Sequence, residues 1–305
     1  MSLTSAPVPA PDGTPATPAR PATARPVREA LREVATRPAG IAGAVLTCIV
    51  VVAAVFAPVI APHPPLYQFP DGLRANGSPV GPNATFLLGT DALGRDVFSR
   101  LLWGLRETLE VSVTANIIAA VIGVAVGCLA GYYGGWLDAV LMRITEVLIA
   151  IPAILLAAFL AIVIRPSLAT LILIVGGVSW FYLAKIVRAE VLSIRQREFV
   201  SAAKLYGAGS GTIMFTHVLR QVWSLVIVYT TLQLSDTATF VSAMSFVGVG
   251  IQPPTPSLGD MIADGSRYLE SVPRLAIVPG VALGLVVLGF NLLGDSLHDA
   301  MEKHA

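Results

Sequence analysis

The sequence predicts an all-α integral membrane protein with six transmembrane helices. Hydrophobic residues make up 55% of its 305 residues and charged residues only 13%. Soluble chains carry about 25% charged residues, so this chain has too few to cover a soluble surface, and a soluble enzyme is excluded. The net charge of +1 gives no electrostatic reason to expect a nucleic-acid partner.

Six stretches are long and apolar enough to cross a hydrocarbon core of ~30 Å, which takes about 20 residues. They cover residues 39–61, 110–138, 146–165, 165–185, 221–250 and 274–295. Together they form one transmembrane domain over residues 39–299. An even number of spans places both chain ends on the same side of the membrane.

The basic residues predict that this shared side is the cytoplasm. With the N-terminus inside, thirteen of the 20 Lys and Arg residues lie on the inner side and seven on the outer side. Cytoplasmic loops retain Lys and Arg, so this orientation is favoured. The inner segments are then the tail 1–38, the turn that holds Arg143, the end of the fourth span from Lys185 with the loop 189–220, and the C-terminus 300–305.

Two segments outside the spans have a distinct composition. The tail 1–38 holds eight Pro among Ala, Thr and Ser and is predicted to be disordered. The extracytoplasmic segment 62–106 holds six Pro, which exclude long helices. From Asp96 to Glu110 apolar residues recur every three or four positions, which predicts an interfacial helix leading into the second span.

Four glycines repeat every four residues in and after the second span: Gly123, Gly127, Gly131 and Gly135. On a helix this spacing gives one bare face. Such a face lets another helix approach closely, which matters because apolar burial does not drive helix association in lipid. The partner helix belongs either to this chain or to another subunit.

Asp236 is an acidic residue deep within a predicted span. A charge in lipid is costly, so this carboxyl group faces a cavity or a partner, or is protonated. One interpretation is a residue on a translocation path. The other is a neutral Asp that is hydrogen-bonded beside Ser235 and Thr237.

The sequence offers no catalytic or cofactor-binding pattern. No two of the four histidines have metal-ligand spacing on one helix face. None of the three lysines follows a glycine, so a phosphate-binding loop of the Gly-Lys-Ser/Thr type is absent. We therefore expect a non-catalytic chain that binds no metal or cofactor.

The loop 189–220 is the most charged part of the chain and predicts a short helix, a turn and a second helix. Gly207 can end the first helix because glycine accepts the left-handed conformation. Thr212 is the expected cap of the next helix. Composition alone leaves two interpretations, a docking element or a solvated loop.

This loop resembles the EAA loop of ABC-importer permeases, in which Glu-Ala-Ala is followed by three residues, a Gly and a later His-x-Leu-Pro. The matching residues are Ser201, Ala202, Ala203, Gly207, His217 and Leu219. Ser201 stands where Glu is usual, and Arg220 stands where Pro is usual.

Four further segments, in order along the chain, resemble signatures of the dipeptide/oligopeptide/nickel permease family and its C-type subunit. Residues 88–96 are similar to LGTDxLGRD, and residues 131–138 to GYxGGxxD. Residues 245–257 are similar to SFLGLGxQPPxPS, and residues 290–295 to FNLLGD. The resemblance covers about residues 38–299.

The resemblance implies a type I (MetI-like) ABC-importer permease in a bacterial plasma membrane. A homologous permease would complete a heterodimeric pore for dipeptides or oligopeptides. Two ATPase subunits, which hold ATP and Mg, would dock on the loop 189–220. An extracytoplasmic binding protein would contact Gln252, Pro253 and Pro254, unless this segment is only a stiff turn.

Two other classes compete with this interpretation. A secondary transporter driven by an ion gradient predicts charged or broken-helix ion sites at mid-membrane, for which Asp236 is the one candidate. A non-transporting scaffold would leave the loop 189–220 unoccupied.

Overall fold

A computed structural model describes residues 34–164 and 167–302. The predicted disordered tail lies outside the described residues except for positions 34–38, and so do residues 303–305. Within the described ranges the chain is helical, and β-type pairing is limited to two isolated bridges, Leu73 with Pro79 and Thr90 with Asp96. The predicted all-α class is therefore confirmed.

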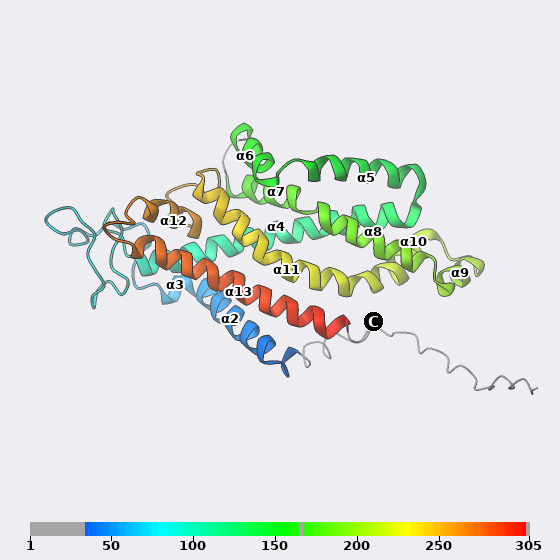
Figure 1. The fold of residues 1–305 in the computed structure, drawn as a ribbon, viewed down its shortest axis with the longest axis horizontal. Coiled ribbons are helices and arrows are strands. Elements are labelled where there is room, and N and C mark those ends of the chain that lie inside the picture. The colour runs from blue at the N-terminus through cyan, green and yellow to red at the C-terminus, as the bar shows by residue number, and fades with distance from the viewer. Residues whose placement is uncertain (1–33, 165–166, 303–305) are drawn as a thin grey trace, which may run out of the picture.

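The helices form one elongated bundle (Figure 1). In chain order they are α2 (Pro38–Val55), α3 (Ala57–Ile60), α4 (Val97–Tyr133), α5 (Gly135–Ala150), α6 (Ala153–Val163), α7 (Leu168–Ser179), α8 (Phe181–Arg195), α9 (Glu198–Leu205), α10 (Ser210–Thr212), the π-helix η1 (Ile213–Val218), α11 (Leu219–Phe246), α12 (Leu258–Ser266) and α13 (Arg274–Glu302). The segment between α3 and α4 lies with α12 at one end, and α9 and α10 lie at the other (Figure 1).

Four described helices are long and apolar enough to cross a membrane: Pro38–Val55, Val97–Tyr133, Ser210–Phe246 and Arg274–Met301. Two bent pairs pass the same test, α5 with α6 at 89° and α7 with α8 at 43°. Counting each bent pair as one span gives the predicted six.

The second span differs from its prediction at both ends. The expected interfacial helix 96–110 is not separate, because α4 runs unbroken for 37 residues from Val97. It ends at Tyr133 rather than at Asp138, since Gly134 takes a φ of 66°. At 1.5 Å per residue α4 is about 55 Å long and extends well beyond a hydrocarbon core of ~30 Å.

The third span also differs, because its helix starts at Gly135 instead of Glu146 and is broken after Ala150. Pro152 lies at the break, where its ring and missing N–H prevent a regular helix from continuing. The start of α5 is fixed from outside: Arg188 on α8 binds Asp138 in a bidentate pair, with Nη2 to Oδ2 at 2.6 Å.

The glycine face of α4 packs against α8 of the same chain. A Cβ atom at Gly123, Gly127 or Gly131 would lie 2.7–3.0 Å from atoms of α8. At Gly127 the two nearest atoms are the carbonyl oxygen of Ala184 and Cβ of Val187, both at 2.7 Å. Only glycine permits this approach of two backbones.

Gly135 does not belong to this face. It takes a φ of 59° beyond the end of α4, and a Cβ atom there would meet nothing within 4 Å. The prediction of a four-glycine stripe is wrong at this position because the chain leaves the helix at Gly134. Gly135 serves the turn into α5 instead.

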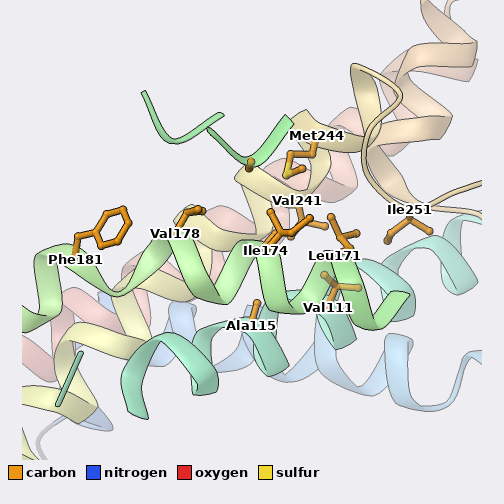
Figure 2. Close-up of a cluster of buried hydrophobic side chains, with 11 residues drawn as sticks. Val111, Ala115, Leu171, Ile174, Val178, Phe181, Val241, Met244 and Ile251 are labelled. Atoms are coloured by element: carbon orange, nitrogen blue, oxygen red, sulfur yellow. The ribbon is translucent and has the colours of Figure 1, made fainter. Parts of the chain in front are cut away.

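A buried apolar cluster joins α4, α7 and α11 at a distance from the loop 189–220. Figure 2 shows Val111 and Ala115 of α4 beside Ile174 of α7, with Val241 of α11 against them. All four are at most 4% exposed. This cluster fixes α11 against the pair formed by α4 and α7.

The start of α2 and the end of α13 lie together. Arg37 Nη1 is 2.5 Å from Asp299 Oδ2. Val34 and Leu297 share a small buried cluster with Val228 of α11. The two ends of the described chain therefore lie on the same side of the bundle, as an even number of spans requires.

Replacing Gly127 with Ala tests the contact between α4 and α8. The new methyl group would collide with α8 backbone, and overpacking of this kind costs about 1–3 kcal/mol. We expect a lower thermal unfolding midpoint for the chain in detergent. Gly177→Ala is the matched control, since a Cβ atom there meets nothing within 4 Å; equal midpoints for both variants would contradict the contact.

Candidate functional site

The short helix α9 carries exposed apolar residues at one end of the bundle (Figure 1). Val200 is buried beneath it, whereas Ser201 and Ala202 are exposed. Leu205 and Tyr206 are 89% and 92% exposed. The helix α9 lies outside the candidate spans. An exposed apolar surface of this kind is typical of a contact with another protein or with a membrane surface.

The turn after α9 is rigid. The Gly207 N–H donates to the Lys204 carbonyl, and the Ala208 N–H donates to the Ala203 carbonyl, both at 3.0 Å. With Gly207 at a φ of 82°, these bonds form a Schellman cap. The prediction that Gly207 ends the first helix of the loop is confirmed.

Two contacts anchor α9 to the long helices, and a third joins the end of α8 to the end of α4. Arg195 Nη1 donates to the Tyr132 carbonyl at 2.9 Å, and Lys204 Nζ lies 5.8 Å from the centre of the Tyr132 ring. The rings of Phe199 and His217 meet edge to face at 6.0 Å. Displacement of α9 would therefore act on α4, α8 and η1 together.

Thr212 does not cap the second helix. That helix starts two residues earlier, after Gly209, and Thr212 lies inside it. Residues Ile213–Val218 then take π-helical geometry and continue into α11. The prediction failed because Ser210 and Gly211 are already helical, so no free amide remains for Thr212 to cap.

The residues that match the EAA pattern divide into two groups. Ser201, Ala202 and Gly207 are exposed. Ala203 and Leu219 pack against the buried cluster under α9, and His217 packs on Phe199. The first group is available to a partner, and the second holds the loop in shape.

Sequence reasoning missed the exposure of two residues. It singled out neither Leu205 nor Tyr206. The available signal was helical spacing: Ala202, Leu205 and Tyr206 stand at i, i+3 and i+4 and so share one face. This face, opposite Val200, is the exposed one.

Asp236 of α11 is exposed on the surface of this chain. Its neighbours do not hold it: the Ser235 hydroxyl lies 2.5 Å from Asn291 Oδ1, and the Thr237 hydroxyl donates to the Gln233 carbonyl at 2.8 Å. Among the described residues Asp236 has no hydrogen bond or ion pair. The described residues therefore offer no hydrogen-bond partner that would support the interpretation of Asp236 as a neutral, hydrogen-bonded residue.

At the opposite end of the bundle, hydrogen bonds of the segment 88–96 hold the loop between α3 and α4 in shape. Asp91 Oδ1 accepts from the amides of Leu93 and Arg95, both at 2.9 Å, and Oδ2 accepts from Arg95 Nε at 2.7 Å. Asp96 caps α4 by accepting from the Ser99 amide at 3.0 Å. Thr90 Oγ1 donates to the Gly72 carbonyl at 2.5 Å. Each polar residue of the motif thus has a structural role.

Arg274 at the start of α13 ties this loop to the bundle. Its guanidinium donates to the carbonyls of Val80 at 2.7 Å, Leu88 at 2.8 Å and Thr90 at 3.3 Å. Sequence reasoning did not single out Arg274, because its carbonyl acceptors lie about 190 residues away in the chain.

Gln252, Pro253 and Pro254 are exposed between α11 and α12. Hydrogen bonds hold the chain on both sides of these three residues. The Ser245 hydroxyl accepts from the Ile251 amide at 3.1 Å, and the Ser257 hydroxyl accepts from the Asp260 amide at 3.1 Å. The segment is displayed at the same end as the loop before α4 (Figure 1).

Metal-binding geometry is absent from the part of the chain that the structure describes, where no group of three or more His, Cys, Asp or Glu could hold an ion. The two described cysteines, Cys48 and Cys128, are free thiols.

An apolar bundle of up to six spans, with a protruding anchored helix at one end and a folded loop at the other, defines a multi-span membrane permease. Residues 123–305 match the family model described as binding-protein-dependent transport system inner membrane component. Residues 25–79 match the N-terminal TM domain of oligopeptide transport permease C. The chain belongs to this family, the permease components of ABC peptide and glutathione importers.

Curated relatives extend over most of the chain. The dipeptide transport system permease protein DppC of Alkalihalophilus pseudofirmus is 34% identical over 91% of this chain and 90% of the relative. The di/tripeptide transport system permease protein DppC of Pseudomonas aeruginosa is 34% identical over 91% and 92%. The glutathione transport system permease protein GsiD of Escherichia coli is 37% identical over 85% and 84%.

Arg274→Lys tests how the loop is held. Lysine keeps the charge but cannot reach three carbonyls at once, and hydrogen bonds to charged groups contribute about 1.5–3 kcal/mol each. We expect faster proteolysis of the loop before α4 in the detergent-solubilised protein. Arg74→Lys, at an exposed residue of the same loop, is the control and should leave the cleavage rate unchanged.

Proposed function

We propose that this chain is the permease subunit of an ATP-driven importer of short peptides. It forms the pore together with a homologous permease and receives its substrate from an extracytoplasmic binding protein. Two ATPase subunits, which hold ATP and Mg, dock on the loop 189–220. The chain itself is non-catalytic and lies in the bacterial plasma membrane with both termini in the cytoplasm.

The observation that carries this proposal is the exposure and anchoring of α9. Leu205 and Tyr206, almost fully exposed, need a protein partner, and small exposed Ala202 beside them permits close approach. Lys204 of α9 lies over the Tyr132 ring, and Arg195 at the end of α8 bonds the Tyr132 carbonyl, so α9 is held at the end of α4 as a lever requires. An ATPase that moves α9 would in this way move α4 and α8.

The translocation path follows the exposed face around Asp236. Burial in lipid would leave this carboxylate without hydrogen bonds, whereas a water-filled pore between two permeases would solvate it. Tyr229, which is partly buried, stands two helical turns before Asp236 on the same face of α11, and Tyr182 of α8 is exposed. A carboxylate flanked by tyrosines suits the ammonium group of a peptide.

The substrate class rests on the relatives, whose names specify dipeptides, di- and tripeptides, and glutathione. All are short peptides with at least one free ammonium and one free carboxylate group. We therefore propose short peptides as the class. The displayed segment at Gln252, Pro253 and Pro254 is the proposed contact of the binding protein, since it lies at the end opposite α9 (Figure 1).

Purification of the tagged chain from native membranes in mild detergent tests the assembly. Mass spectrometry should find a second permease and one or two ATPases in stoichiometric amounts. Recovery of the chain alone, with peptide uptake in liposomes that needs no ATP, would replace the proposal with an ion-gradient-driven transporter. Recovery of the chain alone without transport would favour the scaffold.

Ala202→Trp tests the docking of the ATPases on α9. The indole would fill the space next to Leu205 and Tyr206, so we expect ATP hydrolysis to continue without peptide uptake, or the ATPases to be lost from the purified complex. Uptake per ATP hydrolysed in proteoliposomes measures the effect. Ala139→Trp, at another exposed alanine at the start of α5, is the control; unchanged coupling in Ala202→Trp would sink the docking assignment.

Asp236→Asn tests the translocation path. Because a hydrogen bond to a charged group contributes about 1.5–3 kcal/mol, its loss should lower uptake of the dipeptide Ala-Ala roughly tenfold. The complex should still assemble, because Asp236 makes no hydrogen bond or ion pair with other described residues of the chain. Asp295→Asn, an exposed carboxylate near the end of α13, is the control. Wild-type uptake by Asp236→Asn would remove Asp236 from the path.

A further inference from the structure

A small cavity lies at the outer end of the bundle, among the loop before α4, the end of α12 and the start of α13. Its volume is about 200 Å³. At ~30 Å³ per water molecule, it has room for about six waters or for one short side chain. Val97, Met261 and Leu275 give it an apolar floor. Its charged lining consists of three arginines and two carboxylates: Arg95, Arg100, Arg267, Asp91 and Asp264. The functions assigned above do not use this cavity.

Arg100 is the unusual residue of this cavity, because only 2% of it is exposed. Its Nε atom lies 3.3 Å from Asp91 Oδ2, and its Nη2 atom lies 3.9 Å from Asp260 Oδ2. Its Nη1 atom is buried and has no hydrogen-bond partner in the described parts of the chain. A buried guanidinium with an unused N–H bears a desolvation cost that an added acceptor would offset.

The neighbouring carboxylates do not satisfy this guanidinium. Asp91 already accepts from Arg95 and from two backbone amides. Burial raises the pKa of Asp260, and the charge of Asp264 raises it further. The charges of Arg100, Arg95 and Arg267 lower it. Asp260 Oδ2 lies 3.9 Å from Arg100 Nη2, which is beyond hydrogen-bond distance. Arg267 is exposed beside the cavity and adds a second guanidinium.

We propose that this cavity is a carboxylate-binding site, in which Arg100 and Arg267 bind the anionic group and the apolar floor contacts its aliphatic stem. Arginine suits this task because its planar fork matches the two oxygens of a carboxylate. The carboxylate has two possible sources. One is an acidic side chain of the docked binding protein, and this source rests on the proposed function. The other is the C-terminus of a free peptide.

The rim of the cavity is open enough for either source. Leu93 lines it and is 50% exposed. Tyr268 also lines it and is exposed. Both residues lie outside the candidate membrane spans, so an incoming group reaches the cavity from water.

The test uses the full chain in nanodiscs and two titrations. In the first, isothermal titration calorimetry measures binding of the dipeptide Ala-Ala and of its C-terminal amide, which lacks the carboxylate. In the second, the binding protein that co-purifies with the importer is titrated onto the immobilised chain. Leu93→Trp plugs the cavity and leaves every ion pair in place. Leu87→Trp is the matched control, because Leu87 is equally exposed in the same loop but does not line the cavity.

If the free peptide is the source, Ala-Ala binds, the amide does not, and Leu93→Trp abolishes binding while Leu87→Trp does not. If the binding protein is the source, its affinity falls at least about tenfold in Leu93→Trp and is unchanged in Leu87→Trp, as expected for loss of a buried charge pair. In either case Arg100→Lys should weaken the same titration by about tenfold, with a thermal melt confirming that the variant is folded.

Equal affinities of the wild type and both Trp variants in both titrations would overturn the site, and so would an absence of binding in both. These results are separate from a failure of the proposed function. The peptide titration needs no partner protein, and the importer assignment is decided by co-purification of the ATPases. A chain that purifies alone can still bind Ala-Ala in this cavity.

Discussion

The arrangement of the bundle depends on the close contact between α4 and α8. Gly123, Gly127 and Gly131 lack the side chains that would hold the two backbones apart. The carbonyl oxygen of Ala184 therefore lies only 2.7 Å from the position that a Cβ atom of residue 127 would occupy. In lipid, packing of this kind replaces the hydrophobic effect as the force that joins helices. The contact fixes α8, and through α8 it fixes the position of α9.

The length of α4 lets one helix connect both ends of the molecule. Its first turn is capped by Asp96 and bears Arg100 beside the outer cavity. Its last turn presents the carbonyl and ring of Tyr132 to Arg195 and Lys204. One continuous helix therefore joins the end of the bundle that bears α9 to the end that bears the loop before α4.

Polar residues within the spans fall into two kinds. The Asn116 amide donates to the Thr230 carbonyl at 2.7 Å, and the Gln233 amide donates to the Ser179 carbonyl at 2.6 Å. Both join neighbouring helices and so stabilise the bundle. Asp236, one turn from Gln233 in sequence but exposed, joins nothing described in this chain. The contrast separates polar groups that join helices from one that is exposed on the surface of this chain.

The sequence alone determined the helical class, the approximate spans and the Gly207 cap, because apolar runs and glycine act through local physics. It left open where the glycine face packs, and it misplaced Gly135, Thr212 and the start of α5. Only the tertiary structure decided these points. It also decided that Leu205 and Tyr206 are exposed and that Arg100 is buried with a free N–H, since burial depends on helices that meet from distant parts of the chain.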